Sequence, residues 1–435
     1  MNGAKKKPGK QPATAAANAI TVRMYNVGFG DCFLMRIPTV DGERRMLVDC
    51  GFHSQGKGDF SDAELVGQIK ADLNGEDLHV VVATHRHQDH ISGFGETNLW
   101  TDVPVDEVWL PFTANPESAQ EEPALRAWQG LMEAASAMCD KDGALTPAAL
   151  ATLGSRDAHD QEAVAFMLWN ARANQPAIEN LLRGFKKKDG RPSMRRFLPE
   201  KRKNSDYPTL LTTPVLPGVK THILGPPTDP AMRKGKKVPS TWAFDAAVSA
   251  ASSAPFDSPF ATDWRVPADQ LPGRRPFLDT SLQAIRLFND DLLYAARALD
   301  GFLNGESLVL VLEVGSARLL LPGDAEVGAW MTILDTPAAL ELASSATFVK
   351  VGHHGSHNAT PLTFVREHLA EKTPAMISTQ EGQGKYRAGI PLQELLAEMG
   401  LRHMAFARSD KPTTGEDGIF TPEKKGRWID CTIPC

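Results

Sequence analysis

The sequence lacks long apolar runs and has few cysteines, and both absences restrict where the protein works. No run of 18 apolar residues occurs, so the sequence predicts no membrane span. The N-terminal segment carries lysines but no apolar stretch, which argues against an export signal. Five cysteines are an odd number without a CxxC pair, which argues against a disulfide framework. We therefore expect a cytoplasmic protein with reduced thiols and no membrane partner.

Aromatic residues are also scarce, at 7% of the chain, whereas hydrophobic residues as a whole reach 42%. A chain of 435 residues with this hydrophobic content can bury a full α/β core and still carry insertions. Residues 1–19 combine lysine with alanine, proline and glycine, which predicts a disordered basic tail. We expect residues 20–435 to form a single domain.

Four potential metal ligands lie within six residues of the sequence. Residues 80–82 are three consecutive valines, which predict a strand buried on both faces and ending near Thr84. The ligands follow at the carboxyl end of this strand: His85, His87, Asp89 and His90. Imidazole nitrogen and carboxylate oxygen suit zinc or manganese. An extended backbone would point the first three one way, whereas a turn after His87 would divide the four between two adjacent ions.

This metal stretch, His85–His90, resembles the HxHxDH signature of the metallo-β-lactamase fold hydrolases. The resemblance implies an α/β fold, a four-layered αββα sandwich, with two divalent metal ions, zinc or manganese, at the sheet edge. Residues 304–326 read as two apolar strands joined by a tight turn, with Asp324 beyond the second. They resemble the GDAE block of the ComEC/Rec2-type soluble metallo-β-lactamase domain. That resemblance implies that Asp324 is a catalytic ligand bridging both ions.

A third stretch, residues 346–360, resembles the closing LKVxHHGS motif of the same family. The resemblance implies that either His353 or His354 completes the second metal site, and we favour His354 as the ligand. We expect His354 to act in catalysis with Asp89 and Asp324. The other histidine, or His357, would then protonate the leaving group or hold a phosphate. Ser356 is expected to shape the loop or contact the substrate.

Two aspartates precede the metal stretch. Residues 20–37 predict two strands around a loop whose VGxGD pattern also resembles the ComEC/Rec2-type domain, and this loop ends at Asp31. Asp31 is expected to face the metals as a ligand or as an outer hydrogen-bond acceptor, with an Asx turn as the alternative. The family's middle histidine has no clear equivalent here, which makes Asp31 a candidate ligand of the first ion. Asp49, ending a third strand, resembles the aspartate that orients the histidine loop; a simple cap is the alternative.

Two stretches depart from the family's plan of a core over residues 20–112 and 304–435. Residues 113–218 show helical periodicity at 123–139 and 160–185, which predicts a helical insertion. Residues 228–303 include a part rich in proline, serine and alanine, which predicts a lid-like insertion.

The helical insertion contains a basic segment, residues 183–203, with ten lysines and arginines against two acidic residues. A second basic group occupies residues 233–237. Such charge attracts phosphate backbones, so we expect an anionic phosphodiester substrate, with nucleic acid among the options. A solvated loop is the alternative. The candidate substrate contacts are Lys186, Lys187, Lys188, Arg195 and Arg196.

The leading hypothesis for function is a phosphodiesterase or nuclease that uses a hydroxide activated by two metals. The subfamily resemblance and the basic segment both favour it. One alternative is a lactonase-like or thioesterase-like carbonyl hydrolase, whose sign would be an uncharged pocket far from the basic segment. Another is an effector enzyme that stays silent until a protein partner binds. Homo-oligomerisation also stays open.

Overall fold

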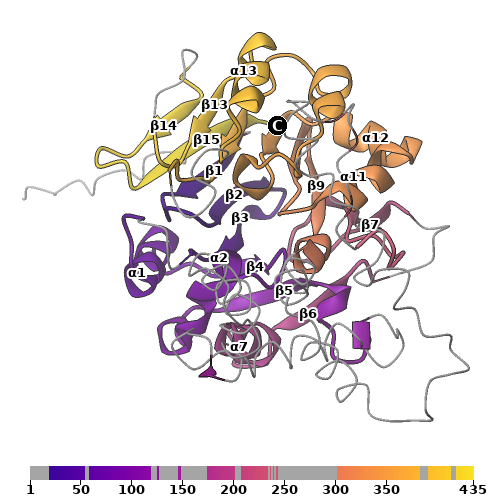
Figure 1. The fold of residues 1–435 in the computed structure, drawn as a ribbon. Helices are drawn as coiled ribbons and strands as arrows, with labels where there is room; N and C mark the ends of the chain where they lie inside the picture. Colours follow the sequence, from indigo (N-terminus) through magenta and orange to yellow (C-terminus); the bar gives the residue numbers. More distant parts are fainter. Residues whose placement is uncertain are drawn as a thin grey trace, which may run out of the picture.

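The computed structural model describes the greater part of the chain (Figure 1). The described residues are 19–53, 58–118, 125–126, 146–147, 174–200, 207–233, 236, 239, 242, 301–382, 390–412 and 418–435. The predicted tail up to residue 18, most of the predicted helix at 123–139 and most of the predicted lid lie outside them. Among the described residues, no helix has the length and apolar character that crossing a membrane requires.

Two β-sheets form the centre of the fold. Over the described residues, the first has eight strands in the order β14-β15-β1-β2-β3-β4-β5-β6, and the second has seven in the order β13-β12-β11-β10-β9-β8-β7. The first sheet comprises β1 (Ala19–Tyr25), β2 (Cys32–Thr39), β3 (Gly42–Cys50), β4 (Leu78–Val82), β5 (Val105–Pro111), β6 (Met194–Leu198), β14 (Phe420–Pro422) and β15 (Trp428–Pro434). The second comprises β7 (Thr209–Leu211), β8 (Lys220–Gly225), β9 (Val309–Val314), β10 (Ala317–Leu321), β11 (Phe348–Lys350), β12 (Ala375–Ile377) and β13 (Phe406–Arg408).

The largest apolar layer lies between the two sheets, because alternate residues of a strand point to opposite faces. In β4, Val80 and Val82 pack into this inner layer, whereas Val81 packs on the outer face of the first sheet. The predicted strand buried on both faces is confirmed. Met46 of β3 and Leu310 of β9 join the same inner layer, so both sheets supply it.

Helices cover the two outer faces. Helix α1 (Asp62–Leu73) packs on the first sheet, and Ser61 and Glu64 form a capping box at its start. On the second sheet lie α11 (Val327–Leu334), α12 (Pro337–Ser344) and α13 (Gln393–Leu401). Figure 1 shows α1 beside the purple strands and α11 and α12 beside the orange ones. The predicted four-layered αββα sandwich is therefore confirmed.

Short helical turns connect these elements. They are α2 (Gln88–Ile91), α7 (Gln175–Glu179), 3₁₀ turns at Ser92–Gly95, Thr97–Trp100, Phe112–Ala114 and His353–Gly355, and π turns at Asn180–Gly184 and Phe364–His368.

The predicted helical insertion contributes strands to both sheets, which the sequence analysis did not anticipate. Strand β6 pairs in parallel with β5 and forms one edge of the first sheet, and β7 forms one edge of the second. Glu107 of β5 explains why a segment rich in arginine becomes a strand. Its buried carboxylate receives hydrogen bonds from Arg196 of β6 (2.8 Å) and Thr213 after β7 (2.6 Å). Arg196 and Thr213 thus link the two sheets through Glu107.

Candidate metal centre

The metal stretch turns after His87, as one of the two sequence interpretations required. His87 has an extended backbone and precedes α2, whereas Asp89 and His90 lie within this short helix. The change from extended to helical backbone separates the four side chains into two pairs. His85 and His87 form one pair, with His85 Nε2 2.9 Å from His87 Nδ1.

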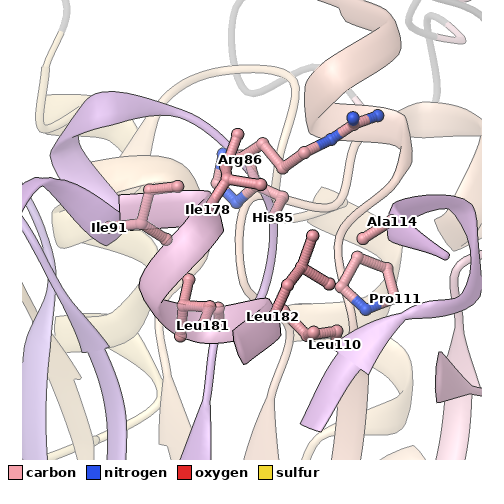
Figure 2. A pocket seen from close by; sticks show the side chains of 10 residues that line it. His85, Arg86, Ile91, Leu110, Pro111, Ala114, Ile178, Leu181 and Leu182 are labelled. Atoms are coloured by element: carbon pink, nitrogen blue, oxygen red, sulfur yellow. The ribbon is translucent and has the colours of Figure 1, made fainter. Parts of the chain in front are cut away.

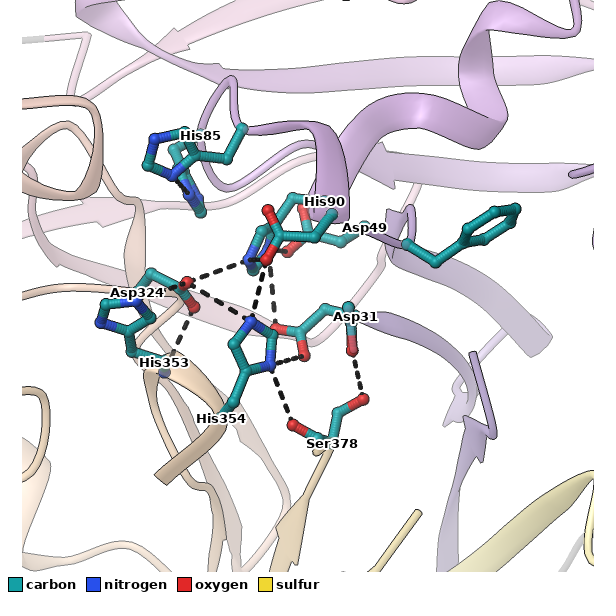
Figure 3. A network of polar contacts seen from close by, with 12 residues as sticks. Asp31, Asp49, His85, His90, Asp324, His353, His354 and Ser378 are labelled. Atoms are coloured by element: carbon teal, nitrogen blue, oxygen red, sulfur yellow. Dashed lines mark hydrogen bonds and ion pairs between the residues drawn. The ribbon is translucent and has the colours of Figure 1, made fainter. Parts of the chain in front are cut away.

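The other pair joins two residues of the second half of the chain. Ligand atoms of Asp89, His90, Asp324 and His354 all lie within 4.8 Å of one another, and all four residues are buried. We call these residues the four-donor cluster. His90 Nε2 is 3.0 Å from Asp324 Oδ2, and His354 Nε2 is 3.0 Å from Asp89 Oδ2. Figure 3 shows His90 arriving from the first half of the sandwich and Asp324 and His354 from the second.

The His85–His87 pair adjoins the four-donor cluster. The rings of His85 and His90 are 4.1 Å apart between centroids, and both histidines are buried. The structure therefore places six of the predicted ligands, His87 included, in one continuous group. The prediction that this group holds two ions stays a prediction.

Asp49 and Thr84 form hydrogen bonds on the side of the His90 ring that faces away from Asp324. Asp49 Oδ1 accepts a hydrogen bond from the Thr84 amide (2.7 Å), and Asp49 Oδ2 accepts one from the Thr84 hydroxyl (2.7 Å). Asp49 Oδ2 also lies 2.8 Å from His90 Nδ1. Because a carboxylate accepts, Nδ1 of His90 donates, and Nε2 is turned toward Asp324. Asp49 thus has the geometry of the predicted orienting aspartate.

Asp31 lies on the far side of the ligand rings rather than among the four donors. Its carboxylate oxygens are 3.6 Å from His90 Nδ1 and 3.8 Å from His354 Nδ1, the nitrogens turned away from the cluster. It also forms an ion pair with Lys350. Of the two roles expected for Asp31, the geometry favours the outer acceptor, and none of its contacts is with His85 or His87 among the described residues.

The loop after β11 presents His353 and His354 differently. Both residues have positive φ angles, 44° and 54°, a conformation that costs energy in residues other than glycine. His354 is fully buried in the cluster, whereas the His353 side chain is 22% exposed and its Nε2 is 3.9 Å from Asp324 Oδ2. The geometry therefore brings His354 to the ligand position that the sequence favoured and leaves His353 at the rim.

Ser378, beyond β12, contacts this loop and was missed in the sequence. Its carbonyl oxygen is 2.9 Å from His354 Nδ1, and its hydroxyl donates to the Gly30 carbonyl in the loop before β2 (Figure 3). The predicted contact residue Ser356 instead donates to Asn358 (2.8 Å), away from the four donors.

The turn before β9 supports the centre at two points. The Ser307 hydroxyl accepts a hydrogen bond from the Asp324 amide (3.2 Å). Glu306, fully buried, forms an ion pair with Arg86 (2.8 Å), the residue between His85 and His87. The resemblance of residues 304–326 to the family block contained the serine, but only the structure shows what these side chains touch.

Burial and charge drive the pKa values in the centre apart. Burial, together with the neighbouring His90 and His87, lowers the pKa of His85 well below its usual value, which keeps this imidazole neutral. Burial opposes charge on His90, but Asp324 and Asp49 outweigh it and raise the pKa of His90. Burial likewise disfavours the Asp324 anion, yet His90 and His353 hold the pKa of Asp324 well below its ordinary range.

The predicted substrate contacts do not line this centre. Lys186 and Lys188 lie near the N-terminal ends of β4 and β5, because the Val105 amide bonds to the Lys186 carbonyl and Lys188 pairs with Asp77. The histidines follow the opposite end of β4, roughly 15 Å away at the usual rise per strand residue. Lys187 lies between the two lysines in this turn.

The arginines among those predicted contacts have partners within the protein. Arg195 donates to the carbonyls of Leu181 and Ser193, and Arg196 pairs with Glu107 and Glu200. Arg233, from the second basic group, is fully buried and donates to the carbonyl of Pro227. These guanidinium groups thus have partners that stabilise the fold, and the assignment of Arg195 and Arg196 to substrate binding stays a prediction.

A small pocket lies directly beside His85 (Figure 2). Apart from His85 and Arg86, its lining is apolar and includes Ile91 and Leu181. Figure 2 shows the Arg86 guanidinium pointing away from these apolar side chains. An apolar surface and the Arg86 guanidinium group therefore lie next to the candidate ligand His85.

The donor set fits divalent cations. It combines imidazole nitrogens with carboxylate oxygens, which zinc and manganese accept in proteins. Buried carboxylates this close together repel one another unless cations lie between them. The four-donor cluster contains both kinds of donor, and its two carboxylates lie close together. The His85–His87 pair adds two imidazole nitrogens next to it.

Comparison with known proteins agrees with this fold and site. Residues 25–127 match the family model of the metallo-beta-lactamase superfamily, a stretch that contains the metal stretch but neither Asp324 nor His354. A search of curated proteins found no match. The match covers about a quarter of the chain and indicates the superfamily over those residues, without a subfamily. The αββα sandwich and the buried His/Asp cluster agree with this similarity, and the site is suited to metal binding.

Proposed function

We propose that the protein is a metal-dependent phosphodiesterase, with nucleic acid as one substrate option. The observation that carries the hydrolase assignment is the four-donor cluster, in which donors from both halves of the sandwich lie within 4.8 Å of one another. In this proposal Asp89, His90 and His354 hold one divalent cation, and His85 and His87 hold the other. Asp324 is shared between them.

Bound there, two divalent cations would lower the pKa of a water molecule toward neutrality and polarise the bond to be cleaved. The protein's own side chains orient the candidate ligands and exclude bulk water. Asp49 and Ser378 fix His90 and His354, and burial of all four donors keeps bulk water out of the cluster. His353, partly exposed beside Asp324, is the candidate proton donor to the leaving group.

Two side chains beside the candidate ligands support an anionic substrate. His353 and Arg86 are both partly exposed, with side-chain exposures of 22% and 15%, and both adjoin candidate ligands. A guanidinium group and an imidazole are suited to non-bridging phosphate oxygens. Together with the motif resemblances, these groups replace the basic segment as the support for a phosphodiester.

A carbonyl hydrolase is the second candidate, and two observations favour it. The described part of the basic segment is remote from the centre, and the pocket beside His85 is mainly apolar.

The test is hydrolysis of bis-p-nitrophenyl phosphate, plasmid DNA, a thioester and a lactone by purified protein, with Mn²⁺, Zn²⁺ or a chelator. We expect metal-dependent cleavage of the phosphodiesters, with kcat/KM lowered at least about 100-fold in Asp324→Asn. Asp335→Asn, which changes an exposed aspartate of the same region, should retain full activity.

Turnover of the thioester or lactone without any phosphodiester cleavage would select the second candidate. His353→Gln separates the roles at the rim. It should lower kcat while leaving the number of bound ions unchanged, whereas loss of an ion in this variant would contradict its assignment as a proton donor.

A further inference from the structure

Lys350 is a buried cation inside the candidate metal centre. It is the last residue of β11, only 4% exposed, and it precedes the loop that carries His353 and His354. In the sequence the lysine belongs to an apolar strand and carries no sign of a role beyond the motif. Burying an ammonium group is costly unless it is paired and hydrogen-bonded, so its contacts require an explanation.

The ammonium group of Lys350 is directed at two carboxylates of the centre. It forms an ion pair with Asp31, lies 3.6 Å from Asp324 Oδ1 and donates to the Gly323 carbonyl (3.3 Å). Oδ1 of Asp324 also accepts from the His353 amide (3.2 Å). With Oδ1 held in this way, Oδ2 is the Asp324 oxygen that faces His90.

The centre gathers four buried carboxylates on four different elements. Asp31 lies before β2, Asp49 is the second-last residue of β3, Asp89 lies in α2 and Asp324 follows β10. Without counter-charges, these anions would repel one another and would each lose hydration. Among the lysines and arginines that the structure describes, Lys350 is the one whose side chain lies within 4 Å of these carboxylates.

We propose that Lys350 is a tethered counter-cation that offsets the charges of Asp31 and Asp324 until divalent cations bind. This inference rests on the proposed metal centre. The ammonium group pairs with Asp31 behind the rings of His90 and His354 and lies beside Oδ1 of Asp324, the oxygen turned away from His90.

The charge of Lys350 determines the direction in which its removal changes stability and metal affinity. In the metal-free protein the ammonium group offsets carboxylate repulsion, so removing it should destabilise the fold. In the metal-loaded protein the divalent cations offset the same repulsion, and the ammonium group repels them. The loss of Lys350 should therefore harm the metal-free state more than the loaded one, and the affinity for metal should rise.

The experiment compares thermal unfolding of the wild type and Lys350→Met, each with chelator and with saturating Mn²⁺ or Zn²⁺. We expect Lys350→Met to lower the melting temperature by about 4 °C in chelator and by clearly less in metal. Competition with a chromophoric chelator should show tighter metal binding, by about threefold or more. The double variant Lys350→Met/Asp31→Asn, which removes both charges, should recover part of the stability lost in chelator.

Equal losses of melting temperature with and without metal would overturn the proposal and leave Lys350 as ordinary packing. Weaker metal binding in Lys350→Met would also overturn it. If Lys350→Met does not fold, the double variant decides: a folded double variant supports the charge argument, and an unfolded one contradicts it. If the melting temperature of the wild type does not change with metal, the proposed metal centre itself is refuted. Failure of the Lys350 proposal and failure of the metal centre are therefore distinguishable.

Discussion

Asp49 combines a strained backbone with three polar contacts, and this combination defines its role. Its φ angle is 56°, in the left-handed region that a non-glycine residue adopts at a cost, and its side chain contacts Thr84 twice and His90 once. Strain of this kind persists only where surrounding contacts compensate for it. Asp49 is therefore expected to matter more for the orientation of His90 than for the stability of the fold.

Replacing Asp49 with asparagine tests this role at constant shape. An amide offers one acceptor oxygen instead of two, so it cannot serve the Thr84 amide, the Thr84 hydroxyl and His90 together. We expect the affinity for divalent metal to fall about 10- to 100-fold, measured by competition with a chelator. Asp41→Asn, in the exposed turn between β2 and β3, is the control and should bind like the wild type. Unchanged affinity in Asp49→Asn would contradict the orienting role.

Protons compete with metal at two histidines. Burial opposes charge on His90 and His354, but Asp324 beside His90 and Asp89 beside His354 raise both pKa values above the ordinary value near 6.5. In the metal-free protein, the stability from these charges is present below that ordinary value and is lost as pH rises through the raised values. Metal binding displaces the protons, so affinity changes in the opposite direction and weakens as pH falls.

Calorimetric titration of the metal-free protein in buffers of different ionisation enthalpy measures this competition. We expect protons to be released on metal binding at pH values near and below the raised pKa values, and less release at higher pH. Binding without proton release at pH 7 would show that the imidazoles are already neutral before metal arrives.

At the scale of elements, the centre depends on two loops passing very close to α2. The Asp31 amide donates to the Asp89 carbonyl (2.8 Å), and the residue after β3 is Gly51. A Cβ atom on Gly51 would lie 2.5 Å from the Gln88 carbonyl oxygen and 2.6 Å from the His90 backbone. Real Cβ atoms do not approach backbone so closely, so only glycine lets β3 end against the metal stretch.

Gly51→Ala should therefore displace α2 and lower both stability and metal affinity. We expect a loss of about 2 kcal/mol in the free energy of unfolding, from denaturant titration. Gly67→Ala is the matched control, because a Cβ at this position in α1 meets nothing within 4 Å. It should raise stability by up to about 1 kcal/mol through helix propensity. Equal effects of the two substitutions would contradict the steric argument.

Elements with a strong local pattern could be predicted from the sequence, and those that depend on a distant partner could not. The valines of β4 form such a local pattern, and the predicted strand is confirmed. Arg196 of β6 was assigned to a substrate-binding basic segment because its partner Glu107 is 89 residues away in the sequence. Lys350 and Ser378 were missed for the same reason, since their contacts are with Asp31 and Gly30.

At the scale of the molecule, the candidate site is assembled across the sandwich. Asp89 and His90 belong to the first half, and Asp324 and His354 follow strands of the second sheet. Periodicity and spacing could indicate the metal stretch alone. Placing Asp324 and His354 beside it required motif resemblance, because 234 residues separate His90 from Asp324. The geometry now brings them together, while their roles as ligands remain part of the proposal.

Removing metal should loosen the contact between the two halves, because ligands from both would bind the same ions. A ligand that binds only the folded state, at 100 times its dissociation constant, adds about 2.7 kcal/mol to stability. We expect a chelator to lower the melting temperature of the wild type by several degrees and to leave Asp324→Asn unaffected, measured by calorimetry. An equal response of both proteins to chelator would indicate metal bound elsewhere.

The order of strands in the first sheet also bears on how the chain is made. Strand β1 pairs along its whole length with β15, from Ala19 opposite Pro434 to Tyr25 opposite Trp428. During synthesis the ribosome releases β1 long before β15 exists, so one edge of β1 stays open in the nascent chain while the intervening residues are translated. Such an edge readily pairs with other strands. Binding of a chaperone to this edge would protect the growing protein until its last strand arrives.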